Sequence, residues 1–215
     1  MTPVRIERSG PILEVTIDRP DARNAIDVDM AWEISRAMDL LDEDPELRLG
    51  IVTGAGGFFS AGADLKAVGR TTRPLPDRGN FGLCRRPPKK LLIAAIEGAA
   101  IGGGFEIALA CDLIVAARGV KFGLPEVKRG LVAAAGGAFR LPRRLPYHLA
   151  AEMLVTGEPR LAEDLAGLGL VNRLVEPGEA LETARGLAAT VLANGPLAVT
   201  ATIRIARDTC SNTLD

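Results

Sequence analysis

The stretch AAIEGAAIGGGFEIALACDLIVAA, residues 94–117, decides how this sequence folds. Its first residues complete an apolar run, 91–96, that has the length and composition of a buried strand. Inside the glycine triplet 102–104 we expect a helix to begin, and it should run to about Cys111. Residues 113–116 again predict a strand. A strand, a glycine turn, a helix and a second strand in close succession indicate an α/β fold.

The rest of the chain continues this alternation. Residues 4–8 and 12–17 alternate apolar with polar around the turn Ser9-Gly10-Pro11, which predicts a β-hairpin. Asp27 is placed to cap a helix that ends near Pro45. Further strands are expected at residues 49–53, 121–123 and 171–175, and further helices near residues 147–155, 161–168, 179–193 and 197–207.

Composition limits the classes of protein to consider. The 215 residues allow one substantial domain, or one domain with a small appendage, and the net charge of −1 argues against a nucleic-acid or membrane-surface protein. The three cysteines lack a CxxC spacing, so we expect no disulfide framework and no zinc site, but a reducing, cytoplasmic location. Neither a signal peptide nor a membrane span is predicted, because charges interrupt the apolar runs.

The common catalytic and nucleotide-binding motifs are missing. The glycine-rich loops at Gly54 and Gly102 fail the G-x-G-x-x-G template, and neither a P-loop nor a G-x-S-x-G nucleophile elbow is present. The only histidine, His148, falls on a predicted amphipathic helix. Metal sites and Ser-His-Asp or Cys-His chemistry are therefore poorly supported.

Two acidic residues remain as candidates. Glu106 follows the glycine triplet in the first turn of its predicted helix, and Glu126 lies in FGLPEVKRG after a short strand. Each also fits a structural role, because the helix dipole favours an acid at the position of Glu106 and Glu126 could pair with Lys128 or Arg129. Asp112 and Glu97 we interpret as capping or ion-pairing residues.

A basic segment precedes the apolar run at residues 91–96. Residues 66–90 hold eight Lys or Arg and one acid, with four prolines, so we expect a loop or a broken helix. Its charges could simply face solvent, or they could receive a phosphorylated ligand. The segment alone leaves both interpretations open.

Several motifs, taken in order, resemble the crotonase (enoyl-CoA hydratase/isomerase) superfamily. They are ARNAI (22–26), FSAGADLKA (59–67), the opening stretch, FGLPEVKRGL (122–131) and GLVNRLVEPGEAL (169–181). The resemblance implies a ββα spiral with C-terminal helices, assembled as a homotrimer or a dimer of trimers, that acts on acyl-CoA thioesters in fatty acid metabolism such as β-oxidation.

The resemblance also divides the chain. It implies a spiral core over residues 1–195 and the start of a C-terminal helical, trimerisation region over residues 196–215, shortened relative to the family because the sequence stops at Asp215. We expect the last six residues, CSNTLD, to be non-helical. A second departure is VAAAGGAFRL (132–141), which is smoother and more apolar than its counterpart in relatives.

By this resemblance, the amides of Ala63 and Gly103 form an oxyanion hole. A thioester whose α carbon gains carbanion character collects negative charge on its oxygen, and each backbone donor aimed at that oxygen is worth about 3 kcal/mol in comparable sites. Such close approach requires minimal side chains, which explains the small residues before Asp64 and Glu106. The N-terminal end of the helix adds further favourable potential.

The acids take catalytic roles by the same resemblance. Glu106 orients and deprotonates a water, and Glu126 donates a proton to Cα, which predicts an enoyl-CoA hydratase. The alternatives are an isomerase or another crotonase reaction, and a non-catalytic acyl-CoA-binding protein. No cofactor is expected, since coenzyme A belongs to the substrate. The positions expected to bind substrate and CoA are Arg23, Ala25, Ala61, Ala63, Asp64, Leu65, Lys66 and Gly103.

Overall fold

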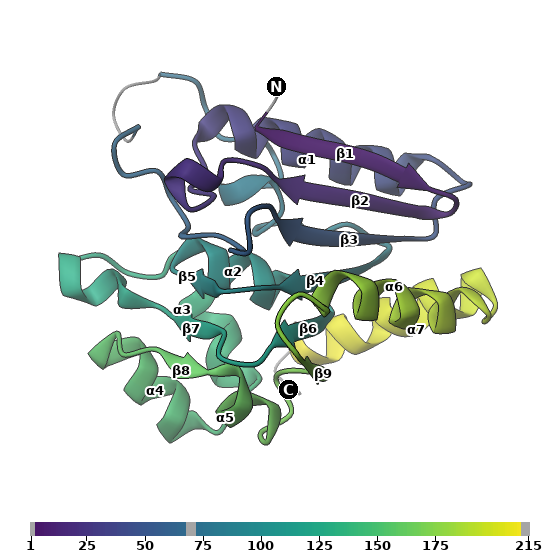
Figure 1. Cartoon of the computed structure of the whole chain (residues 1–215). Coiled ribbons are helices and arrows are strands. Elements are labelled where there is room, and N and C mark those ends of the chain that lie inside the picture. Colours follow the sequence, from purple (N-terminus) through teal and green to yellow (C-terminus); the bar gives the residue numbers. More distant parts are fainter. Residues whose placement is uncertain (1–2, 68–71, 212–215) are drawn as a thin grey trace.

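A computed structural model describes residues 3–67 and 72–211 (Figure 1). Strands β1 (Val4–Ser9) and β2 (Ile12–Ile17) form the predicted antiparallel hairpin. From β2 onward all neighbours in the main sheet are parallel. The sheet has six strands in the order β1-β2-β3-β4-β6-β9, where the later strands are β3 (Leu49–Gly54), β4 (Leu91–Ile96), β6 (Leu113–Ala117) and β9 (Arg173–Val175).

A second, smaller sheet carries the region of the glycine triplet. Its order is β5-β7-β8, with β5 (Ala99–Ile101) parallel to β7 (Lys121–Gly123) and β7 antiparallel to β8 (Arg160–Leu161). The sequence predicted β7 but not β5 or β8. The β5 residues Ala-Ala-Ile are all apolar and β8 has only two residues, so neither shows the polar–apolar alternation of Lys121-Phe122-Gly123.

The helices include those predicted, with small shifts at their ends, and one short helix, Gly137–Arg140, that was not predicted. They are α1 (Val28–Glu43), α2 (Gly103–Ala110), α3 (Gly137–Arg140), α4 (Tyr147–Thr156), α5 (Ala162–Ala166), α6 (Ala180–Leu192) and α7 (Pro196–Ser211). Single 3₁₀ turns occur at η1 (Pro20–Ala22), η2 (Asn80–Gly82), η3 (Pro125–Arg129) and η4 (Leu141–Arg143). Asp27 caps α1 as predicted, because its carboxylate accepts a 2.9 Å hydrogen bond from the Met30 amide.

Both faces of the main sheet are covered (Figure 1). One face packs with α1 and α2 into the larger apolar core, which includes Ile34, Phe105 and Phe122. The opposite face packs against α6 through its buried alanines Ala180, Ala184 and Ala188. Burial on both faces explains why the parallel strands are continuous apolar runs rather than alternating ones.

Helix α7 is tied to the sheet by Arg207. Its guanidinium donates to both carboxylate oxygens of Asp112, at 2.7 and 2.6 Å, and to the carbonyl of Pro88. Asp112 also accepts from the Leu92 amide of β4, which confirms its predicted ion-pairing role. The prediction that residues 210–215 are non-helical is wrong for residues 210 and 211, since α7 extends to Ser211 beyond this anchor. Residues 212–215 lie outside the described part.

Glu97 has the predicted capping role. Its carboxylate accepts hydrogen bonds from the amides of Gly178 and Ala180 and thereby satisfies the start of α6. The division of the chain at residue 195 stays a prediction. Across residues 3–67 and 72–211, no single helix is long and apolar enough to span a membrane. Helices α6 and α7 together have sufficient length and apolar composition, but the pair is bent by 110°.

Candidate active site

Parallel strand registers bring three separate loops together. Ile101 pairs with Gly123 between β5 and β7, and the Gly102 amide continues the ladder with a 2.8 Å bond to the Gly123 carbonyl. A parallel bridge joins Ser60 to Ala100. Because the carboxyl ends of parallel strands meet at one edge, the segments that follow Ser60, Ile101 and Gly123 converge.

The two amides predicted for the oxyanion hole belong to neighbouring segments. The Ser60–Ala100 bridge brings these segments together, and a Cβ atom placed on Gly62, the residue before Ala63, would fall 2.5 Å from the Gly103 nitrogen. Hydrogen bonds between Ile26 and the residues flanking Ala63 fix this strand-like segment. Within the described residues, the amides of Ala63 and Gly103 donate to no protein acceptor, so both are available to a ligand.

Each glycine of the triplet admits a different neighbour. A Cβ atom on Gly102 would meet the Glu126 carboxylate at 3.2 Å, one on Gly103 would meet the ring tip of Phe81 at 2.1 Å, and one on Gly104 would meet the Ser60 carbonyl at 2.2 Å. The triplet therefore brings together the second acid, an aromatic ring and the neighbouring backbone. A side chain at Gly103 or Gly104 would displace one of them.

Glu106 is buried on α2, with 3% of its surface exposed. Its Oε1 accepts a 2.9 Å hydrogen bond from the Gly137 amide at the start of α3. Burial raises the pKa of the Glu106 carboxyl above its ordinary value, the Gly137 bond opposes that rise, and the nearby charge of Glu126 adds to it. The carboxyl is thereby suited to exchange protons nearer neutrality.

Glu126 is half-buried on η3 and faces the same edge. Its Oε2 is buried without a hydrogen-bond partner, and burial raises the pKa of the Glu126 carboxyl. The alternative in which Glu126 pairs with Lys128 or Arg129 is not found among the described residues, where Lys128 instead pairs with Glu158 at 2.5 Å. A buried, unpaired carboxyl oxygen beside a second carboxyl is typical of catalytic sites.

Buried apolar residues lie close to both acids in the sequence. Phe105 and Phe122 are fully buried with their ring centroids 5.1 Å apart, and Leu124 is also buried. Leu131, at the end of the FGLPEVKRGL motif, is by contrast 52% exposed.

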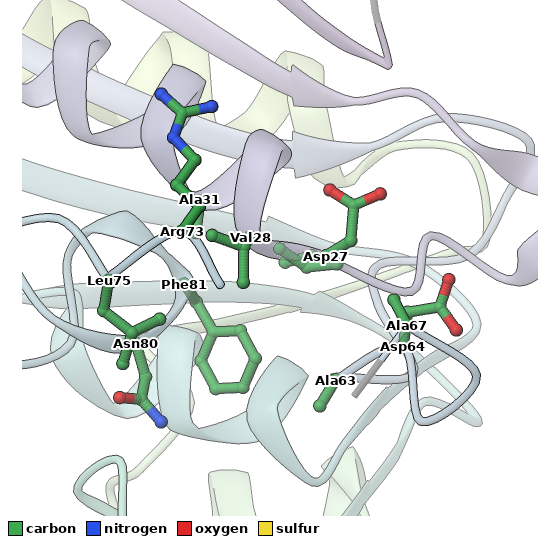
Figure 2. Close-up of a pocket in the computed structure, with 11 residues that line it drawn as sticks. Asp27, Val28, Ala31, Ala63, Asp64, Ala67, Arg73, Leu75, Asn80 and Phe81 are labelled. Carbon is green, nitrogen blue, oxygen red and sulfur yellow. The ribbon is translucent and has the colours of Figure 1, made fainter. Parts of the chain in front are cut away.

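Only some of the residues predicted to bind CoA line a cavity. Ala63 and Asp64 border a cavity of about 270 Å³ that lies between α1 and the loop before η2 (Figure 2). Asp64 accepts a 2.7 Å bond from Arg19, and this bond holds the pKa of its carboxyl below the usual range. Gly103 contacts the cavity wall at Phe81. The lining does not include the other five predicted positions, Arg23, Ala25, Ala61, Leu65 and Lys66.

These five positions nevertheless belong to the two chain segments, ARNAI and FSAGADLKA, that meet near Ala63. The Ala61 amide donates to the Arg23 carbonyl at 2.9 Å, so ARNAI and SAGAD run alongside one another. Arg23, Leu65 and Lys66 are exposed, and Ala25 and Ala61 are half-buried.

Three of the eight basic residues in segment 66–90 bind partners within the protein. The buried Arg78 pairs with Asp39 and Asp42 of α1 at 2.8 and 2.7 Å. Arg73 pairs with Asp29, and Lys90 donates to two carbonyls after α1. Arg70 lies outside the described residues. These contacts favour a structural role for Arg73, Arg78 and Lys90 over the capture of a phosphorylated ligand.

Three residues that shape the site were not predicted from the sequence. The Phe81 ring and the Gly137 amide have no local signal, because both contacts join distant parts of the chain. Asn24 could have been found, as the asparagine within ARNAI. Asn24 is buried at a φ of 53°, and its side-chain amide donates to the carbonyls of Ala55 and Phe58. The Ser60 hydroxyl in turn donates to the Asn24 backbone carbonyl.

Comparison with known proteins agrees with this architecture. The sequence model of a family described as enoyl-CoA hydratase/isomerase matches residues 7–215. A carnitinyl-CoA dehydratase from Salmonella arizonae is 45% identical over 211 residues, which make up 96% of this chain and 80% of that protein.

Two solved structures are similar over nearly the whole chain. An enoyl-CoA hydratase from Mycobacterium tuberculosis H37Rv has a TM-score of 0.96 and 50% identity, covering 100% of this chain and 85% of that one. A carnitinyl-CoA hydratase from Mycobacterium avium has a TM-score of 0.93 and 43% identity, covering 96% and 81%. This chain belongs to the enoyl-CoA hydratase/isomerase, or crotonase, family, with activity of the hydratase or dehydratase type.

Proposed function

We propose that this protein is a hydro-lyase that adds water across the 2,3 double bond of an enoyl-CoA thioester. The observation that carries the proposal is that Glu106 and Glu126 approach the edge where the segments of Ala63 and Gly103, whose amides are unengaged, come together. Each group has a distinct task in such a reaction, and the tasks can be written as balanced proton and electron movements.

The thioester oxygen accepts hydrogen bonds from the two amides. Glu106, as carboxylate, removes a proton from water while the water oxygen bonds to Cβ. The electron pair of the double bond moves to form an enolate, whose charge the amides stabilise. Glu126, as carboxylic acid, donates its proton to Cα and completes the 3-hydroxyacyl thioester. Proton exchange between the two acids restores their starting states.

The raised pKa values of both carboxyls support this division. A carboxyl that keeps its proton nearer neutrality can act as an acid, and burial raises the pKa of Glu126 without an opposing ion pair. Coenzyme A is part of the substrate, and the reaction needs no other cofactor. The homotrimer or dimer of trimers expected from the resemblance is also a proposal, which sedimentation of the purified protein would test.

A second candidate is the reverse reaction on a carnitinyl thioester. The relatives named carnitinyl-CoA dehydratase favour it at 44–45% identity. Carnitine carries its hydroxyl on Cβ, so loss of water from carnitinyl-CoA would use the same amides and the same two acids in the opposite direction.

Turnover separates these candidates. Purified protein is given crotonyl-CoA, a 3-enoyl-CoA and carnitinyl-CoA, and the enoyl-thioester absorbance is followed with product identification. We expect the absorbance of crotonyl-CoA to fall as 3-hydroxybutyryl-CoA forms. Faster gain of absorbance from carnitinyl-CoA would favour the second candidate, and conversion of the 3-enoyl thioester alone would indicate an isomerase. Binding of acyl-CoA without any turnover would overturn the enzymatic proposal.

A further inference from the structure

Phe81 adopts a backbone conformation that bulky residues rarely use. Its φ and ψ of 57° and 17° are left-handed, within the 3₁₀ turn η2. Glycines at 79 and 82 also have positive φ on either side of it. A left-handed aromatic residue is strained, and such strain persists only where the surrounding structure enforces it.

The surroundings of η2 hold this turn in place. Gly82 packs so closely against α1 that a Cβ atom there would lie 2.2 Å from the Ala31 carbonyl. The amides of Gly82 and Cys84 bond back to Gly79 and Asn80. The turn therefore has little freedom to carry Phe81 elsewhere.

This conformation directs the ring at the predicted oxyanion hole. The Cζ, Cε2 and Cε1 atoms of Phe81 lie 2.1, 2.4 and 2.8 Å from the place where a Gly103 Cβ would be, so the tip of the ring fills the space of the missing side chain. Phe81 is only 8% exposed, yet it also lines the cavity that Ala63 borders. Figure 2 shows the ring between Val28 of α1 and Ala63.

We propose that Phe81 is a specificity-determining residue that excludes acyl groups branched at the α carbon. This inference rests on the proposed function. An oxygen bound to the Gly103 amide brings the carbonyl carbon and its two substituents next to the Gly103 Cα, where the ring tip already lies. Bulk added at the α carbon therefore meets the ring, whereas length added farther along the acyl chain does not.

The test compares straight and branched substrates in wild type and Phe81→Ala. The ratio of kcat/KM for 2-methylcrotonyl-CoA to that for crotonyl-CoA should rise about tenfold or more in the variant, the usual range for a methyl group in a tight pocket. The ratio for 2-hexenoyl-CoA to crotonyl-CoA should change less than threefold. Leu75→Ala is the matched control, because Leu75 lines the same cavity but is 48% exposed.

Binding gives a readout that does not depend on turnover. The affinity ratio of 2-methylbutyryl-CoA to butyryl-CoA should rise by a similar factor in Phe81→Ala, and Phe81→Leu should fall between the variant and wild type. If wild type hydrates nothing but this ratio shifts, the proposed function fails and the inference stands. If Phe81→Ala remains folded by circular dichroism and neither ratio changes, Phe81 has a purely structural role and the inference is overturned.

Discussion

At the scale of single residues, the two buried carboxyls proposed for catalysis also lower the stability of the folded protein. Glu106 and Glu126 are carboxyls whose pKa values burial raises above 4.5. In the pH range between the unfolded and the folded pKa, the folded protein holds more protons than the unfolded chain. The free energy of unfolding contributed by these two groups therefore falls as pH rises through that range.

Replacing Glu126 by glutamine should consequently stabilise the protein at neutral and higher pH. The neutral amide removes the cost of a buried charge whose Oε2 has no partner, and we expect a gain of about 1 kcal/mol at pH 8. The gain should shrink as pH is lowered towards 4.5, where wild-type Glu126 is itself protonated. Urea unfolding at several pH values measures it. A variant less stable than wild type at pH 8 and equal at pH 5 would contradict this account of the carboxyl.

Replacing glycine by alanine should have opposite effects on stability at Gly104, in the glycine triplet, and at Gly186, in α6. Gly104→Ala places a methyl group 2.2 Å from the Ser60 carbonyl, and backbone cannot yield cheaply, so unfolding free energy should fall by about 1–3 kcal/mol. Gly186→Ala, in the middle of α6 with nothing within 4 Å, should instead raise it by about 0.5–1 kcal/mol. Denaturant titration compares them. Equal effects at both positions would show that the close approach at Gly104 is not constraining.

At the scale of elements, the site depends on register. The Ser60–Ala100 bridge and the β5–β7 pairing bring the segments of Ala63 and Gly103 together and place Glu126 beside Gly102. The sequence predicted β7, α2 and the closeness of both acids, because strand and helix periodicity and recognisable motifs are local signals. It did not predict β5, whose three residues lack periodicity, or the contacts of Phe81 and Gly137, which arise only from tertiary packing.

Helix α7 should depend strongly on its one anchoring arginine. Arg207→Ala would leave Asp112, whose side chain is 9% exposed, without its cation, at a cost of about 1–3 kcal/mol. The control is Arg118→Ala, which removes the exposed pair with Glu176 and should cost less than about 0.5 kcal/mol. Thermal and urea unfolding would quantify both. Similar small losses in the two variants would mean that α7 does not need this ion pair.

At the scale of the whole molecule, the core protects two thiols. Cys84 and Cys111 are fully buried, and burial raises the pKa of both thiols. Reagents therefore cannot reach the sulfur atoms, and little of the reactive thiolate forms. In a Cys210→Ser background, which removes the cysteine whose side chain is not described, iodoacetamide should label neither thiol until the protein unfolds. Mass spectrometry along a urea gradient follows the labelling. Rapid modification of either cysteine in native buffer would contradict the compact core.

The function proposed for the whole molecule requires that a pair of acids beside two free amides hydrates a thioester. The most direct measurement is the crotonyl-CoA hydration rate together with the butyryl-CoA dissociation constant, for wild type, Glu106→Gln, Glu126→Gln and Glu163→Gln. Glu163 is a matched control, since it too has a buried, unpartnered carboxyl oxygen, but on α5. We predict that kcat falls about 10²–10⁴-fold in the first two variants with affinity nearly unchanged, and that Glu163→Gln keeps its activity. Full hydration activity in either Glu106→Gln or Glu126→Gln would contradict the account.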